Sequence, residues 1–406
     1  MKESSFKEFI EIQRGHDLPM KDRAEGNVPV IGSNGIVGSH NSSKGIVPGI
    51  TIGRSGSIGN VIYLDEPYFP LNTTLYVTDF KENHERFVYY FLKNFDFSSF
   101  DSGSVQPSLN RNYIYTAMIK YPSFKEQKKI AEFLENFDKK IEINQKINKI
   151  LEQTANTLFK SWFIDFDPVR AKAEKKPTGL SKEISDLFPD SFEDSELDKI
   201  PKGWNVGKIS ENFETILGGT PARKNKNYWQ GNLGWINSGK LNDFPVNIAS
   251  EFINEEAVQG SSTKLANRKS TLIGLVTEMK KDLITFLDED LYINQSIVAI
   301  QPNKNIFPEY VYLYLKANSI RLYSEQSGGA QQHINKGTVN NFKILLPDEK
   351  CLSKVNYYFE SIFTKICSNA RENIVLNNLR DALLPKLVSG QMKLSDAKSL
   401  TKEAEI

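Results

Sequence analysis

The chain has 406 residues and a formal net charge of +1, so it is long enough for two or three domains, each with its own core. This small net charge excludes a protein that binds polyanions over its whole surface, and any nucleic-acid surface must be local. Two cysteines exclude a disulfide framework and favour a reducing compartment. No run of about 18 apolar residues occurs and the N-terminus lacks an apolar signal core, so we expect a cytoplasmic protein without a membrane partner.

Short strands separated by turns fill the first part of the chain. Runs of β-branched and apolar residues predict strands at 28–31, 49–53 and 74–77, followed by a short helix at 87–93. The same kinds of element return later, as strands at 271–276 and 296–300 and a helix at 310–316. The aromatic residues of both short helices have helical spacing, which indicates core positions and not base-stacking residues.

The chain repeats itself about 225 residues apart. Asn110 to Phe163 aligns without a gap with Asn335 to Val388 at a constant shift (335 − 110 = 225). The preceding stretch 102–110 meets 327–335 at the same shift. Such a long-period duplication predicts two copies of one module in a pseudo-twofold molecule, which can hold two similar ligands at a fixed separation.

A long helix is predicted in each copy, over 130–162 and over 355–387. Apolar residues recur there at alternating steps of four and three, which is the a/d seam of a coiled coil. The first helix would be about 50 Å long, which exceeds one turn of B-DNA. If the two helices pair antiparallel, they place the two modules at opposite ends and act as a ruler.

Both seams turn polar at matching positions. Asn144 and Asn148 in the first helix align with Asn369 and Asn373 in the second. Buried asparagines cost stability when unpaired but penalise slipped registers, so we interpret these four as a register lock. The alternative is two independent amphipathic helices, each docked on its own domain with its asparagines exposed.

Between the copies, residues 171–200 contain several prolines and glycines, which are typical of turns, and an acidic run. Their apolar residues show little helical or strand periodicity. These features predict a linker that returns the chain to the start of the second module. Because its net charge is negative, we expect it to face solvent or a protein partner and not DNA.

The loops of the two modules differ in sequence. Such a difference is expected if each module recognises a different DNA sequence. Phosphate contacts need cations and small donors, and base edges need Arg, Asn and Gln. Glycines around Arg54 would let a tight loop approach a duplex. The candidate DNA-binding residues are Arg14, Lys21, Arg23, Lys44, Arg54, Ser55 and Ser57 in the first module, and Arg223, Lys224, Lys226, Lys240, Arg268, Lys280 and Lys281 in the second.

Four polar residues occupy equivalent positions between module and helix: Gln106 and Asn110 in the first copy, and Gln331 and Asn335 in the second. Their equivalence favours a common role. They either join the domain to the helix by hydrogen bonds, which we favour, or grip a phosphate.

The sequence lacks the catalytic and cofactor-binding motifs expected of a nucleic-acid enzyme. The chain contains no Pro-Pro dipeptide, so it lacks the Asn/Asp-Pro-Pro-Tyr/Phe loop with which N6-adenine methyltransferases hold the flipped base. It also contains no Gly-Lys-Ser/Thr phosphate cradle. Four scattered histidines and two cysteines do not form a metal motif. We therefore expect no catalytic residues, no bound metal and no cofactor in this chain.

Several segments together resemble one known family, the specificity subunits of type I restriction–modification systems. The resemblance covers nearly the whole chain. The segments that carry it are Leu158–Arg170, Phe188–Phe192, Ile200–Trp204, Gly218–Pro221 and Leu379–Gly390.

The resemblance implies an α+β fold with two pseudo-twofold-related α/β target-recognition domains, separated by two long antiparallel coiled-coil helices. It implies that each domain reads half of a bipartite asymmetric site in double-stranded DNA. It also implies two methyltransferase subunits as partners, with motor-endonuclease subunits joining through them, and with S-adenosylmethionine, ATP and Mg on these partners. The expected layout is a first recognition domain at 1–122, a spacer helix at 123–170, a linker at 171–201, a second domain at 202–347, a second spacer helix at 348–393 and a tail at 394–406.

Two features depart from a perfect duplication. Trp204 opens the second module without a counterpart, so the first module either lacks its opening element or starts upstream. The segment around Arg54 also has no like-for-like match in the second copy. A second function stays open at this point, namely a non-catalytic coiled-coil scaffold whose paired modules bind protein partners.

Overall fold

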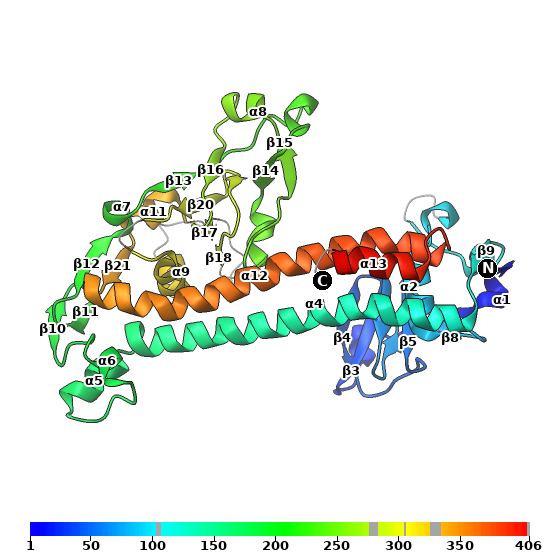
Figure 1. Cartoon of the computed structure of the whole chain (residues 1–406), viewed down its shortest axis with the longest axis horizontal. Helices are drawn as coiled ribbons and strands as arrows, with labels where there is room; N and C mark the ends of the chain where they lie inside the picture. Colours follow the sequence, from blue (N-terminus) through cyan, green and yellow to red (C-terminus); the bar gives the residue numbers. More distant parts are fainter. Residues whose placement is uncertain (103–106, 276–282, 304–305, 325–333, 404–406) are drawn as a thin grey trace. The chain divides into compact units, whose positions relative to one another are not determined.

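The computed structural model of the chain describes residues 1–102, 107–275, 283–303, 306–324 and 334–403 (Figure 1). The chain divides into two compact units. Unit 1 comprises Met1–Glu142 and Ile374–Ile406, and unit 2 comprises Ile143–Asn373. Each unit therefore contains one module together with a part of each long helix.

The module of unit 1 is built from small sheets with short helices beside them. Its strands are β1 (Lys2–Ser5), β2 (Glu11–Arg14), β3 (Val28–Gly32), β4 (Gly35–His40), β5 (Gly49–Gly53), β6 (Val61–Leu64), β7 (Phe69–Pro70), β8 (Thr74–Asp79) and β9 (Met118–Tyr121), and its helices are α1 (Phe6–Phe9), α2 (Glu85–Asn94) and α3 (Arg111–Ile114). The sheet orders are β2-β8-β5-β6 and β4-β3-β7, and β1 pairs antiparallel with β9.

The module of unit 2 has the same strand order with one strand more. Its strands are β12 (Asn205–Lys208), β13 (Thr215–Leu217), β14 (Leu233–Ile236), β15 (Glu251–Ile253), β16 (Lys264–Ala266), β17 (Thr271–Gly274), β18 (Ile284–Phe286), β19 (Leu291–Ile293), β20 (Ile297–Ile300) and β21 (Lys343–Leu346). The sheets β13-β20-β17-β18 and β15-β14-β19-β16 repeat those of unit 1, and β12 pairs with β21 as β1 does with β9. In both units one sheet contains a parallel pair, β3 with β7 and β14 with β19.

The structure confirms the predicted elements of both modules. The strands predicted in the first module are β3, β5 and β8, and those in the second are β17 and β20. The two predicted short helices are α2 and α9 (Pro308–Ala317). Their aromatic residues lie in the cores, since Phe87, Tyr90 and Tyr310 are fully buried.

The opening strand of the first module is present, which corrects the suggestion that it is lost. Strand β1 takes the place in unit 1 that β12 takes in unit 2, and each is followed by a single helical turn, α1 or α7 (Ile209–Asn212). In unit 2, the hairpin of β10 (Phe192–Ser195) and β11 (Asp198–Pro201) precedes Trp204.

The segment 171–201, predicted as a linker with little periodic structure, is folded. It contains the end of α5 (Asp167–Ala173), α6 (Lys182–Ser185) and the β10–β11 hairpin. Phe188 is buried among the aromatic side chains of Trp162, Phe163 and Trp204. Burying a few widely spaced apolar residues holds such a segment in place although its sequence has no helical or strand period.

The predicted tail at 394–406 contains a helix, α13 (Leu394–Glu403), within unit 1. Ala397 is fully buried in the core of that unit, and Thr401 is buried as well. The final residues 404–406 lie outside the described part of the chain.

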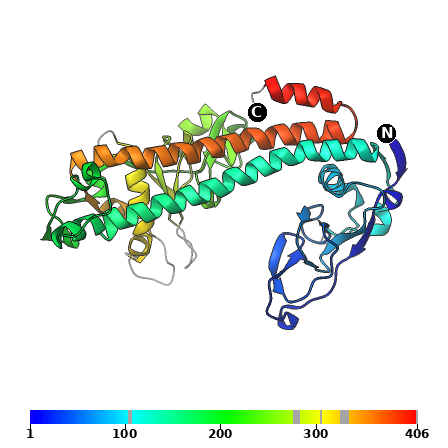
Figure 2. The same cartoon turned by 60° about the horizontal axis from the view of Figure 1, so that its bottom comes forward.

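The two predicted long helices are α4 (Phe124–Phe159) and α12 (Glu349–Val388), and within each unit they lie side by side (Figures 1 and 2). A five-residue π-helical segment, Lys160–Ile164, continues α4. The apolar seam residues are buried or half-buried, as a coiled-coil seam predicts. None of the described helices is long and apolar enough to cross a membrane.

The four asparagines of the seam meet within unit 2. Asn144 donates through Nδ2 to Oδ1 of Asn373 at 2.9 Å, and Asn369 donates through Nδ2 to Oδ1 of Asn148 at 2.8 Å. Asn148 in turn donates to the carbonyl oxygen of Ile366 at 3.0 Å. Low residue numbers of one helix face high numbers of the other, so the pair is antiparallel here. The alternative with exposed asparagines is wrong, because Asn144 and Asn369 are almost completely buried.

The register role of these asparagines is a prediction that a double-mutant cycle checks. Asn148→Leu removes the partner of the buried Asn369 amide, so the free energy of unfolding should fall by about 1–3 kcal/mol. The double variant Asn148→Leu/Asn369→Leu should recover most of this loss, because two facing leucines leave no buried polar group. Lys149→Leu, at an exposed position one residue away, is the control. Additive losses in urea unfolding of the double variant would contradict the pairing.

Candidate nucleic-acid interface

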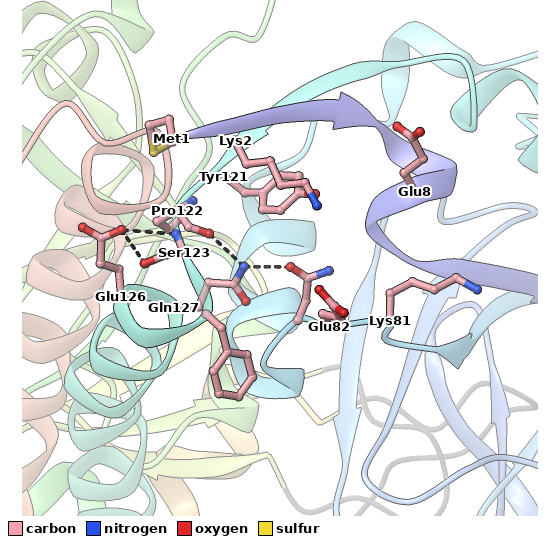
Figure 3. Close-up of a pocket in the computed structure, with 12 residues that line it drawn as sticks. Met1, Lys2, Glu8, Lys81, Glu82, Tyr121, Pro122, Ser123, Glu126 and Gln127 are labelled. Carbon is pink, nitrogen blue, oxygen red and sulfur yellow. Dashed lines mark hydrogen bonds between the residues drawn. The ribbon is translucent and has the colours of Figure 1, made fainter.

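A hollow of about 920 Å³ lies in unit 1 where α4 begins (Figure 3). The buried Gln127 fills its floor and donates through Nε2 to Oδ1 of Asn83 at 2.7 Å and to the carbonyl of Pro122 at 3.0 Å. Ser123 and Glu126 cap the first turn of α4 by hydrogen bonds between them (Figure 3). Lysines and glutamates both line the hollow. Its polar groups are used in joining module to helix, and its mixed charge does not favour a polyanion.

A second hollow in unit 1, of about 510 Å³, has a different character. We call it the arginine hollow, and define it by Gln13, Arg14, Arg54, Asn110 and Arg111, which line it with four further residues. Among all its described lining residues there are three arginines and no aspartate or glutamate. A concave surface with this excess of positive charge favours an anion.

The sheet brings two of these arginines together. Strand β8 lies between β2 and β5, and Leu75 of β8 is paired with both Arg14 of β2 and Ile52 of β5. Arg54 follows directly after β5. The two arginines, 40 positions apart in the sequence, therefore reach the same end of one sheet.

Backbone hydrogen bonds from separate segments hold the chain at Arg54. Its N–H donates to the carbonyl of Thr73 at 2.9 Å, and its own carbonyl accepts the N–H of Leu109 at 2.9 Å. The latter bond places the neighbouring Asn110 and Arg111 beside Arg54. The next residue, Ser55, accepts a hydrogen bond at its carbonyl from the Ser33 hydroxyl at 2.7 Å, from the β3–β4 turn. The Arg54 backbone is thus fixed before any ligand binds.

The glycines of this loop are required by its geometry. A Cβ at Gly53 would lie 2.0 Å from the carbonyl oxygen of Ser57, and Gly56 has a φ of +82°. A side chain at either position would therefore open the loop or strain it. These contacts show a tight loop around Arg54, and the approach of this loop to a duplex stays a prediction.

The arginines of the hollow have few internal partners. Arg54 donates through Nη1 only weakly, to the carbonyl of Asn72 at 3.3 Å. Arg14 lies 3.9 Å from Asp17, and both side chains are more than half exposed, so this ion pair contributes little. Burial, and after it the nearby charge of Arg14, lower the pKa of Arg54. The group remains a cation, but its charge is less well compensated than that of a solvated arginine.

The other candidates of the first module have more varied surroundings. Arg23 donates through Nη1 to the carbonyl of Val37 at 2.7 Å and so supports the β3–β4 hairpin. Lys44 lies 5.9 Å above the ring of Phe69. Lys21 and Ser57 are exposed, and Ser55 is half-buried. A DNA-binding role for these residues stays a prediction.

Two arginines among the candidates of the second module are held by carboxylates. Arg223 forms two hydrogen bonds with Glu251 at 2.6 and 2.7 Å and stacks on Trp229, and these bonds lower the pKa of Glu251. Arg268 donates through Nε to Oδ1 of the buried Asp288 at 3.0 Å. Both arginines therefore have a structural use.

The lysine candidates of the second module differ in their surroundings. Lys224 and Lys226 are exposed. Lys240 forms an ion pair with Asp243 at 3.1 Å. Lys280 and Lys281 lie outside the described residues.

The asparagines shared by the two copies are helix caps. Asn110 accepts the N–H of Asn112 at the start of α3, and Asn335 accepts the N–H of Thr338 at the start of α11 (Lys336–Asn341). Each asparagine thus caps a short helix within its own module, and the predicted role of joining the domain to the long helix stays a prediction. Gln106 and Gln331 lie outside the described residues.

Two residues of the arginine hollow, Gln13 and Arg111, are absent from the sequence-based candidates. Gln13 precedes Arg14 in β2, and Arg111 follows the Asn110 cap. Both are residue types that contact base edges or phosphates in DNA complexes. Their proximity to Arg54 depends on the pairing of β2, β8 and β5 and on the Leu109–Arg54 bond, which no local pattern shows.

Ionic clusters join each module to its helices. In unit 1, Asp138 of α4 accepts the Tyr90 hydroxyl of the module at 2.5 Å and Nη1 of Arg380 of α12 at 2.6 Å. Burial, and after it the Asp138 charge, raise the pKa of Tyr90, so its hydroxyl remains a donor. In unit 2, Asp288 of the module accepts Nη1 of Arg371 of α12 at 2.6 and 2.7 Å. Within the described residues, no cluster of His, Cys, Asp and Glu could hold a metal ion.

Curated relatives and a solved structure are similar to the chain over most of its length. The type I restriction enzyme HindI specificity subunit of Haemophilus influenzae is 28% identical over 329 residues, which cover 70% of this chain and 71% of that protein. The MjaIX specificity subunit of Methanocaldococcus jannaschii is 28% identical over 318 residues, covering 76% and 69%. The crystal structure of a type I restriction-modification S subunit from M. genitalium matches with a TM-score of 0.57 at 14% identity, covering 95% and 96%, which shows a common fold.

The sequence model of one family, the type I restriction modification DNA specificity domain, matches the chain in two stretches. These are residues 1–153 and 201–366, and together they make up more than half of the chain. Each stretch contains one module, and the first extends over most of α4 while the second ends within α12. The chain therefore belongs to the type I restriction modification DNA specificity domain family.

Proposed function

We propose that this chain is the DNA specificity subunit of a type I restriction–modification complex, and that its two modules read the two halves of one bipartite asymmetric site. The observation that carries this proposal is the doubled specificity domain, which folds twice with the same strand order. The loops of the two copies differ, as in the segment around Arg54 and its counterpart. Two copies of one fold with different loops are suited to reading two different short sequences.

The long helices are proposed to set the gap between the two half-sites. Each of them runs from one unit into the other, since α4 covers residues on both sides of Glu142 and α12 covers residues on both sides of Asn373. A helix has a fixed rise per residue, so its length is a measure that the sequence controls. The buried asparagine pairs support a single register of the two helices.

The chain itself is proposed to be non-catalytic. The sequence lacks the loop for a flipped adenine and the phosphate cradle of a motor, which supports partners that supply both. In this proposal, two N6-adenine methyltransferase subunits bind S-adenosylmethionine, and motor-endonuclease subunits that join through them bind ATP and Mg. The complex would act on cellular DNA in the cytoplasm.

Exchange of one module tests the proposal. Residues 1–122 are replaced by the corresponding module of another family member, and the methylated motif is mapped in cells that carry the methyltransferase partner. We expect one half-site to change while the other half-site and the gap remain. The reciprocal exchange of residues 202–347 is the matched control and should change only the second half-site. A motif that is the same after both exchanges would contradict the proposal and favour a scaffold.

A further inference from the structure

We propose that the arginine hollow is a seat for one phosphodiester group of the DNA backbone, with Arg54 and Arg111 as its anion-binding side chains. This inference rests on the proposed function, and it assigns to the hollow a positioning role that is distinct from base reading. Contacts to phosphates fix where a protein sits on a duplex, whereas contacts to base edges select the sequence.

The shape of the site favours a phosphate over a base edge. Arg54 is half-buried and lines the hollow. A group that enters a hollow must protrude from its own molecule. Phosphates lie on the outside of a duplex, whereas base edges lie within the grooves and are reached by projecting side chains. The shape of the hollow therefore favours a phosphate of the DNA backbone as its ligand.

The charge of the site favours the same ligand. Arg14, Arg54 and Arg111 are all cations, and the described lining residues include no carboxylate. Asp101, which pairs with Leu109 in an isolated β-bridge, is not among the lining residues, and its Oδ1 accepts the backbone N–H of Ser108 at 2.8 Å. A base edge offers only partial charges and would leave the guanidinium groups repelling one another. A phosphodiester brings a full negative charge, and its oxygens match the planar fork of arginine.

The rigidity of the site suits an anchor. The backbone of Arg54 is hydrogen-bonded to Thr73 and to Leu109. Arg111 begins α3, whose cap is the Asn110 side chain. Binding to donors that are already held in place costs less conformational entropy than binding to free side chains. Arg14, whose side chain is 54% exposed, would complete the cluster from the rim.

Salt titrations of DNA binding test the phosphate seat. The full chain, in complex with its methyltransferase partner, is titrated with a 30-bp duplex that carries the methylated motif and with a scrambled duplex, between 50 and 200 mM KCl. Arg54→Ala and Arg111→Ala should each reduce the slope of log K against log salt by about 1. The ratio of wild-type to variant affinity should then change about 3.5-fold across this range. The preference for the motif over the scrambled duplex should stay as in the wild type.

Two further variants make the outcome specific. Arg54→Lys keeps the charge, so it should retain the salt slope while binding both duplexes more weakly, because the fork is lost. Lys120→Ala removes an exposed cation of the same module that does not line the hollow, and it should leave the slope unchanged. Single methylphosphonate substitutions, which neutralise one phosphate at a time, should remove the effect of Arg54→Ala at one position only.

Two results would overturn the phosphate seat. One is an Arg54→Ala variant that loses affinity for the motif but not for the scrambled duplex, since that is the behaviour of a base reader. The other is an Arg54→Ala variant that behaves like Lys120→Ala. If the wild-type complex binds DNA but does not prefer the motif, the proposed specificity function fails, while the salt slopes with the scrambled duplex still decide on the phosphate seat.

Discussion

Replacing Arg371 with methionine is expected to lower the free energy of unfolding of unit 2 by about 3 kcal/mol. Arg371 of α12 donates twice to Asp288, whose side chain is only 1% exposed. Without Arg371, the buried carboxylate keeps the ion pair with the half-exposed Arg268 and its hydrogen bond with the Cys367 thiol. Removing one partner of a buried ion pair leaves the remaining charge buried and only partly compensated, and this is why the loss should be large.

Two buried thiols report on this loss. Cys351 and Cys367 both lie in unit 2, and burial raises the pKa of each to about 12, so neither should react with a thiol reagent at pH 8 in the native protein. A loss of 3 kcal/mol corresponds to labelling that is about 100-fold faster if the thiols react through opening of unit 2. Urea unfolding measures the same change directly.

Matched variants separate the lost ion pair from lost packing. Lys365→Met, at an exposed position of the same helix, should have little effect. The double variant Arg371→Met/Asp288→Leu should be more stable than Arg371→Met alone, because an apolar pair leaves no buried charge. Equal stability of Arg371→Met and Lys365→Met would show that the contact between module and helix does not depend on this cluster.

Lengthening both long helices is expected to move the two half-sites apart. One heptad is inserted after Glu142 and one after Asn373, where the chain passes from one unit to the other, so the interior of each unit stays intact. Each insertion adds about 10 Å of helix, or roughly three base pairs along the duplex. The original motif should no longer be methylated, and a motif with a gap about three base pairs longer should replace it. This new motif should be methylated less efficiently, because three base pairs also turn the second half-site by roughly a third of a turn.

A single insertion is the control for the lengthened helices. The same heptad placed only after Glu142 shifts one helix against the other by two turns, so the antiparallel pairing cannot be kept along its whole length. This variant should give no new motif. If the doubly lengthened protein still methylates the original motif with its original gap, the helices do not determine the spacing.

The periodic parts of the fold were predictable from the sequence. The long helices follow from an apolar repeat of alternating three and four residues, and the short strands from runs of β-branched residues between turns. A meeting of the four asparagines was predictable as well, because the duplication matches Asn144 with Asn369 and Asn148 with Asn373. Antiparallel packing then exchanges the partners, so that Asn144 pairs with Asn373 and Asn148 with Asn369. The periodic elements show within a short stretch of sequence, and the asparagine positions show when the two copies are aligned. One sequence is therefore enough to find both.

The arrangement of the candidate site was only partly predictable. Arg14 and Arg54 were among the sequence-based candidates, but Gln13 and Arg111 were not, because the pairing of distant strands brings Gln13 to Arg54 and the backbone bond from Leu109 to Arg54 brings Arg111 there. The sequence also does not show whether a cationic residue already forms an ion pair within the protein. Arg223, for example, is paired with Glu251. The segment 171–201 was expected as a linker because its few buried apolar residues show no period.

The measurement that tests the central claim most directly is a genome-wide map of N6-methyladenine. Cells that carry this chain with its methyltransferase partner are compared with cells that carry the partner alone. We expect a motif of two parts with a fixed gap that is methylated only when the chain is present. Unchanged methylation by a partner shown to be active without the chain would contradict a specificity role.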